Sequence, residues 1–134
     1  MSRRKPDIYE RQKQMRWEAY HRSPFVKEKY LQVAKIVVNM EFKNPDWGDD
    51  PDPLQETYSQ QSKAFFKIDC PHIECISGGF DLSWTIDELV TSQLEKTSGT
   101  ITCQGWQDKE RINKHHCFLE MNYTITVHYI KESL

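Results

Sequence analysis

The sequence lacks any apolar run long enough to cross a membrane. No stretch approaches the roughly eighteen consecutive apolar residues of a membrane-spanning helix. The first five residues, Met1 to Lys5, are polar and basic, without the apolar segment of a secretory signal peptide. We therefore expect a cytoplasmic protein with no membrane contact. The chain is also short of apolar residues, at 37% with a mean hydropathy of -0.78, so part of it should lie outside the core.

The chain is also too short for two independent cores, because 134 residues match one domain of ordinary size. Its four cysteines are unsuited to permanent disulfides in a reducing cytosol. Metal ligation, burial as small apolar groups, or redox chemistry are the alternatives that remain.

Charge is distributed unevenly along the chain. Residues 1 to 30 hold nine Lys or Arg against four acids, whereas the whole chain has a net charge of -2. We therefore divide the chain into a basic N-terminal helical arm, residues 1 to 29, and a more acidic α+β domain, residues 30 to 134. A basic arm of this kind binds nucleic acid, an acidic protein surface, or its own domain.

Residue patterns predict an α+β fold. Residues 7 to 22 follow Pro6, lack Gly and internal Pro, and predict a helix that ends before Ser23 and Pro24. Apolar and polar residues alternate as in half-buried strands over residues 34–43, 63–70, 100–103 and 117–129. A helix over 83 to 95 carries an apolar stripe that covers the sheet. We expect about four antiparallel strands, because the connections are short.

The cysteines supply the main candidate site. Cys70, Cys103 and Cys117 share the phase of the core-facing residues of their predicted strands, and each stands at a strand end. Cys75 follows on the turn after Cys70, and a hairpin loop over 105 to 116 would bring Cys103 close to Cys117. Four thiolates predict a closed, tetrahedral structural zinc site at one sheet edge. Buried thiols without metal, and ligation by His72, His115 or His116 in place of a cysteine, stay open as alternatives.

A resemblance supports this interpretation. Several segments of the chain resemble a family of small uncharacterised bacterial proteins. They are the run from Cys70 through Cys75, the Gly-Gly-Phe-Asp-Leu-Ser segment before the helix, the Thr-Cys-Gln-Gly-Trp-Gln-Asp segment, Cys117 and the last alternating strand. More loosely, these segments resemble zinc ribbons. The resemblance covers residues 70 to 130 and implies a recurrent four-cysteine fold, but it implies no activity.

Other motifs favour interaction over catalysis. The pair His116 and Cys117 would point to opposite faces of a strand, which argues against a nucleophilic pair. Calcium-loop and phosphate-loop patterns are absent. We therefore predict a non-enzymatic protein-interaction or adaptor module stabilised by zinc. The alternative is an RNA- or ribosome-associated protein that binds through basic residues interleaved with aromatic rings. The candidate nucleic-acid residues are Arg3, Arg4, Lys5, Arg11, Lys13, Arg16, Trp17 and Arg22.

Overall fold

The computed structural model describes residues 7–44, 50–71, 75–76, 79–103, 106–109, 113–116 and 119–131. Along these residues the helices are α1 (Asp7–Arg22), α2 (Val26–Lys29) and α3 (Ser83–Thr91). The strands are β1 (Val33–Lys43), β2 (Leu54–Ser59), β3 (Lys67–Ile68), β4 (Cys75–Ile76), β5 (Phe80–Asp81), β6 (Lys96–Thr102), β7 (Trp106–Lys109), β8 (Asn113–His116) and β9 (Glu120–Tyr129).

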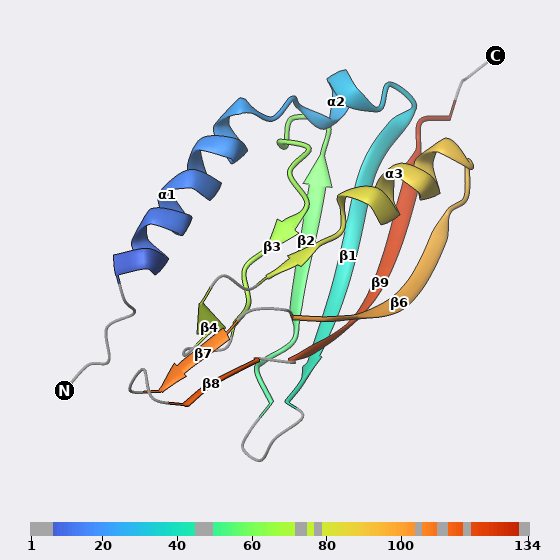
Figure 1. Ribbon diagram of the computed structural model, residues 1–134. Coiled ribbons are helices and arrows are strands. Elements are labelled where there is room, and N and C mark those ends of the chain that lie inside the picture. The colour runs from blue at the N-terminus through green and yellow to red at the C-terminus, as the bar shows by residue number, and fades with distance from the viewer. Residues whose placement is uncertain are drawn as a thin grey trace.

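Four strands form the main sheet, in the order β2-β1-β9-β6, and every neighbouring pair is antiparallel. Figure 1 shows the two long strands β1 and β9 side by side at the centre, with α3 lying across one face. The sequence-based prediction of an α+β fold with a four-stranded antiparallel sheet and a packed helix is therefore confirmed. The alternation of apolar and polar residues in β1 and β9 gives this sheet one buried and one exposed face.

The core lies between the inner face of the sheet and the layer that contains α3 and the β3–β5 pair. β1 contributes Ile36, Val38 and Met40, and β9 contributes Met121 and Ile125, all at most 1% exposed. From the other layer, Phe66, Leu82, Ile86, Leu89 and Val90 complete the same cluster. Each such side chain contributes about 1.5–3 kcal/mol by leaving water, so packing of these two layers accounts for most of the stability of the domain.

The helix predicted over 83 to 95 is shorter than expected. α3 ends at Thr91, and the backbone of Gln93 takes a left-handed conformation with φ of 56°. A left-handed residue cannot continue a right-handed helix. Ile86, Leu89 and Val90 are buried as the apolar stripe predicts, but Leu94 lies beyond the helix and is 56% exposed.

The prediction was wrong about one of the four strands of the main sheet. β2 covers residues 54–59, which were not predicted as a strand, and it pairs with β1 from Leu54 opposite Met40 to Ser59 opposite Lys35. Only Tyr58 of β2 is even half-buried, so no alternation marked this strand. Within the predicted strand over 63–70, only β3 is a strand, and it pairs with β5 in the layer that contains α3.

The structure differs from the predicted pattern in two further places. The register between β1 and β9 shifts between Val33 and Lys35, and Val33 rather than Ala34 is buried. The expected hairpin loop over 105 to 116 contains two paired strands, because β7 runs antiparallel to β8 from Trp106 opposite His116 to Lys109 opposite Asn113. β4 pairs with the other edge of β7, so β4, β7 and β8 form a separate three-stranded sheet, which we call the second sheet.

Candidate functional site

Cys103 follows β6 directly and faces the core. Its side chain is fully buried, and its backbone N–H donates to the carbonyl oxygen of Leu119 at 2.9 Å. The thiol sulfur accepts a hydrogen bond from the backbone N–H of Gly79 at 3.4 Å. Cys70 is half-buried and packs against the same core. The inward phase predicted for Cys103 is therefore confirmed, and Cys70 lies at the boundary of the core.

Gly79 is the residue that allows the Cys70 segment and Cys103 to approach each other. Its φ is 143°, a conformation that residues with a side chain rarely adopt, and a Cβ added there would lie 2.8 Å from the carbonyl oxygen of Ile68. Ile68 precedes Cys70 by two residues and pairs with Phe80 across β3 and β5. One glycine thus contacts both the strand that leads to Cys70 and the sulfur of Cys103.

The second sheet brings the segments around the other two cysteines to the same place. Cys75 in β4 is opposite Gln107 in β7, only four residues after Cys103 in the chain. On the other side of β7, Trp106 is opposite His116, the residue immediately before Cys117. Figure 1 shows β4, β7 and β8 together near the end of the main sheet where β6 ends and β9 begins.

Strand pairing therefore links segments that are close in sequence to Cys75, Cys103 and Cys117, and the four-cysteine ligand set stays a prediction. Cys117 and His72 lie outside the described residues. Within the described part of the chain, no group of three or more His, Cys, Asp or Glu side chains is placed to hold a metal ion. Zinc, and the replacement of one cysteine by His115 or His116, thus remain predictions.

α1 forms a second candidate site, and one side of it is attached to the domain. The helix ends at Arg22 before Ser23 and Pro24, as predicted. Arg16 makes an ion pair with Asp69, and the rings of Tyr20 and Phe65 meet edge to face at 5.8 Å between centroids. These contacts anchor the side of α1 that also carries the half-buried Ala19.

The end of α1 is fixed by a lysine from the domain. The Lys63 ammonium donates to the carbonyl oxygens of His21 at 3.2 Å and Ser23 at 2.9 Å. Terminal carbonyl groups of a helix have no partner within the helix, and a cation there also interacts favourably with the helix dipole. The arm is thus attached at its last turn and along one side.

The opposite side of α1 is exposed to solvent. We call this set of exposed residues the α1 outer face: Arg11, Lys13, Gln14, Met15, Trp17, Glu18, His21 and Arg22. Trp17 is 59% exposed and Met15 is 68% exposed. The Trp17 ring meets the His21 ring at 4.0 Å between centroids. Glu18 accepts hydrogen bonds from Gln14 and Arg22, each at 3.4 Å.

The predicted nucleic-acid residues fall into three groups. Arg11, Lys13, Trp17 and Arg22 belong to the α1 outer face. Arg16 points to the domain and pairs with Asp69. Arg3, Arg4 and Lys5 lie outside the described residues. Four of the eight residues are therefore exposed along α1.

The buried Tyr30 and the half-buried Tyr58 connect the layers of the domain and have raised pKa values. The Tyr30 hydroxyl donates to Asp87 of α3 at 3.2 Å, and burial followed by the nearby Asp87 charge raises its pKa. Burial, with a smaller effect of Glu56, raises the pKa of Tyr58 to about 12. A raised pKa moves each phenol further from ionisation at physiological pH, so neither serves as a base, and we assign both residues to the stability of the fold.

Sequence reasoning missed a shallow cavity on the exposed face of the main sheet. The cavity has a volume of about 380 Å³, and its polar side chains come from β1, β6 and β9. The alternation predicts that Asn39, Glu41, Asn122 and Thr124 are outward residues, and it predicts no site there. The available signal was composition, since three successive outward positions of β9 carry the uncharged polar residues Asn122, Thr124 and Thr126.

Comparisons with known proteins add no assignment, because no protein-family model, curated protein or solved structure matches the chain. The resemblance of residues 70 to 130 to a bacterial four-cysteine family therefore stays a prediction. Within the described residues, none of the helices has the length and apolar character needed to span a membrane.

Proposed function

We propose that the protein is a non-enzymatic interaction module that binds an acidic, partly apolar protein surface through the α1 outer face. Its four cysteines hold a structural zinc that fixes the second sheet against the main sheet. The observation that carries the proposal is the position of Trp17 and Met15. Both are exposed on a helix whose opposite side is anchored to the domain.

Exposed Trp and Met side chains are typical of binding surfaces. Tryptophan and methionine are enriched at protein interfaces, and a buried tryptophan is often a residue whose loss weakens binding most. A helix that only covers its own domain would turn these side chains inward. On α1 the inward side instead carries Arg16, Ala19 and Tyr20, which leaves Trp17 for another surface.

Charge favours a protein partner over nucleic acid. Arg11, Lys13 and Arg22 give the α1 outer face a positive balance, which complements an acidic surface. Glu18, however, lies between Met15 and Trp17 on the helix surface, as the spacing of about 100° per residue dictates. A carboxylate at that position repels the phosphates of a nucleic acid backbone but is easily matched by a single basic residue of a protein.

Support for the zinc proposal comes from the backbone around the cysteines. The pairing of β4 with β7, and of β7 with β8, brings together segments that adjoin Cys75, Cys103 and Cys117. The hydrogen bond from Gly79 to the Cys103 sulfur is of the kind that orients metal-bound thiolates from outside the ligand shell. A zinc with four cysteine ligands has no open coordination position, so its role is structural.

Site-specific crosslinking in cells tests the docking proposal. A photoreactive benzoyl-phenylalanine replaces Gln14 on the α1 outer face in one variant and Leu94, which is 56% exposed beyond α3, in the other. We expect one dominant adduct from position 14 that protease destroys and nuclease leaves intact. The adduct should disappear with Trp17→Ala and persist with Trp84→Ala, which removes an equally large side chain that is 74% exposed elsewhere.

Two outcomes of this experiment would contradict the proposal. An adduct that nuclease removes would establish the alternative, in which the basic and aromatic residues of α1 bind RNA. Identical adducts from positions 14 and 94, or no adduct from position 14, would show that the α1 outer face is no specific docking surface.

A further inference from the structure

The exposed face of the main sheet is a continuous polar surface. Residues directly opposite each other in an antiparallel sheet point to the same face. The register therefore places Asn39, Thr124 and Ser98 in one row across β1, β9 and β6. The next row contains Glu41, Asn122 and Thr100. Rows are about 6.8 Å apart along a strand and neighbouring strands about 4.8 Å apart, so the six side chains form a regular grid.

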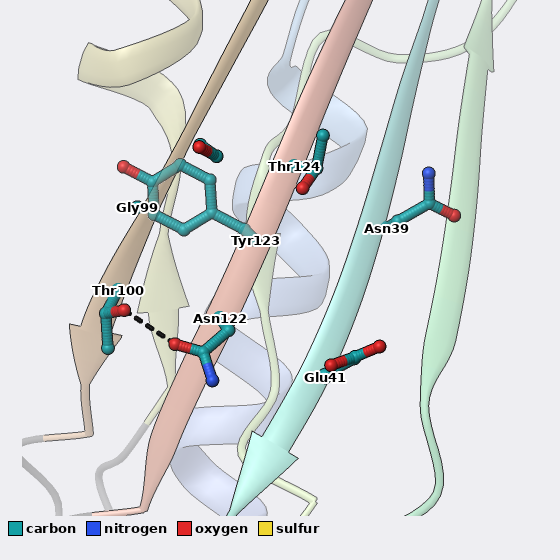
Figure 2. Close-up of a pocket in the computed structure, with 8 residues that line it drawn as sticks. Asn39, Glu41, Gly99, Thr100, Asn122, Tyr123 and Thr124 are labelled. Atoms are coloured by element: carbon teal, nitrogen blue, oxygen red, sulfur yellow. Dashed lines mark hydrogen bonds between the residues drawn. The ribbon is translucent and has the colours of Figure 1, made fainter.

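These six residues also line the cavity of about 380 Å³, together with Gly99 and Tyr123. Figure 2 shows the grid in relation to the strands, with Asn39 and Glu41 on β1 and Asn122 and Thr124 on β9. Cavities that hold small molecules in proteins have volumes of about 300–1,000 Å³. The cavity is therefore large enough for one or two sugar rings and too small for a folded domain.

Hydrogen bonds orient the two amides of the grid. The Thr100 hydroxyl donates to Oδ1 of Asn122 at 2.6 Å, and Gln55 Nε2 donates to Oδ1 of Asn39 at 2.7 Å. Because each amide oxygen already accepts a bond, each Nδ2 group remains as a donor with a fixed direction. Fixed donors beside the hydroxyls of Thr124 and Ser98 suit a ligand with several hydroxyl groups.

Gly99 and Tyr123 are opposite each other in β6 and β9, and they alternate with the grid residues, so they point to the core-facing side of the sheet. A Cβ at this position would lie 2.5 Å from the hydroxyl oxygen and 2.9 Å from Cζ of Tyr123. Figure 2 shows the Tyr123 ring beside Gly99, between β9 and β6. The glycine therefore gives the ring its place on the core-facing side, and the cavity surface is formed by the six outward side chains of the grid.

We propose that this cavity binds an oligosaccharide of amino sugars, with a sugar ammonium at Glu41. Within the described part of the chain, Glu41 is the one charged side chain that lines the cavity. A single carboxylate repels phosphates and sulfates and attracts one positive charge, while the remaining lining residues match neutral hydroxyl groups. A sugar whose ring carries one ammonium among its hydroxyls has this arrangement. The site lies on the main sheet and is separate from the α1 outer face.

Three trimers with the same β-1,4 backbone test the proposal. The glucosamine trimer carries ammonium groups, the N-acetylglucosamine trimer carries acetamido groups, and cellotriose carries hydroxyls. We expect the full-length protein to bind the glucosamine trimer about tenfold more tightly than the other two, since an ammonium adds a charge-assisted hydrogen bond. Backbone amide shifts in NMR titrations should be confined to β1, β6 and β9.

Two variants complete the test. Glu41→Gln should weaken the glucosamine trimer about tenfold and abolish the preference among the three trimers. Glu88→Gln, which changes an exposed carboxylate on α3, should leave both unchanged. Equal affinity for the three trimers, no measurable binding of any of them, or an affinity that Glu41→Gln does not alter would overturn the proposal.

Discussion

The backbone N–H of Gly79 donates a hydrogen bond to the sulfur of Cys103 at 3.4 Å. This bond joins two segments that are 24 residues apart in the sequence. Because Gly79 also lies against Ile68, the strand before Cys70 reaches the same place. The packing of a single glycine thus links the sulfur of Cys103 to the strand that leads to Cys70.

We predict that tag-free protein purified from cells contains one equivalent of zinc per chain. Cys75→Ser or Cys117→Ser should lose the metal and the cooperative unfolding transition, because binding of a structural zinc contributes directly to folding. Elemental analysis together with thermal unfolding measures both effects. Metal-free protein that unfolds at the same temperature with and without chelator would contradict this prediction.

Histidine variants distinguish the four-cysteine ligand set from its alternative. His116→Ala and His115→Ala change residues of β8 beside Cys117 and should retain the full equivalent of zinc. Loss of zinc in one of these variants, combined with retention in a single Cys→Ser variant, would assign that histidine as the fourth ligand.

We predict that Gly79→Ala destabilises the domain by about 1–3 kcal/mol. Its φ of 143° is strained for alanine, and the added Cβ would lie 2.8 Å from the carbonyl oxygen of Ile68. Chemical denaturation measures the change. Gln93→Gly is the matched control, because Gln93 also has a positive φ, of 56°, and glycine relieves strain there. Equal stability of Gly79→Ala and the wild type would contradict this account of Gly79.

The long central strands could be predicted from the sequence because their side chains report burial directly. In β1 and β9 every second residue enters the core, so alternation revealed Ile36, Val38 and Ile125 as inward residues. β2 left no such trace, because it lies at the sheet edge with all but Tyr58 exposed. β2 pairs with β1, and the six residues of β2 alone do not indicate this pairing.

Segment 63–70 shows why the same pattern also misleads. Ala64 and Phe66 are buried and Ile68 and Cys70 pack against the core, so the alternation is real. The segment nevertheless lies in the second layer, where only Lys67 and Ile68 pair with another strand. Alternation reports which side chains are buried but not the strand that the backbone joins. For the same reason the polar cavity around Asn122 could not be derived from β9 alone, since it depends on the register of three strands.

We predict that Asp69→Asn loosens α1 while leaving the domain stable. The substitution removes the ion pair with Arg16, whose contribution on a partly exposed surface is about 0–1 kcal/mol. Hydrogen exchange of the α1 amides should become faster, whereas the unfolding midpoint of the domain should move little. Glu18→Gln, which breaks the exposed Glu18–Arg22 pair of the same helix, serves as the control. Equal protection of α1 in Asp69→Asn and the wild type would show that the ion pair does not hold the helix.

We predict that the free energy of unfolding falls as the pH rises above 10, in part through Tyr58. Burial raises the pKa of Tyr58 to about 12 in the folded protein, from its ordinary value of 10.0. Below pH 10 the phenol is protonated in both states, so its contribution to stability is fully present. Between pH 10 and about 12 the unfolded chain releases this proton while the folded chain retains it. The contribution is therefore lost as the pH rises through this window.

Tyr58→Phe separates this effect from the other groups that titrate at high pH. The ring of Tyr58 meets that of Phe66 at 4.9 Å between centroids, and phenylalanine preserves this packing. Denaturation at several pH values should show a shallower decline in the variant, by up to about 1.4 kcal/mol per pH unit. A wild-type decline that Tyr58→Phe leaves unchanged would mean that the Tyr58 phenol is not kept neutral by its burial between β2 and the core. The decline would then belong to Tyr30 and Tyr129, whose pKa values burial also raises.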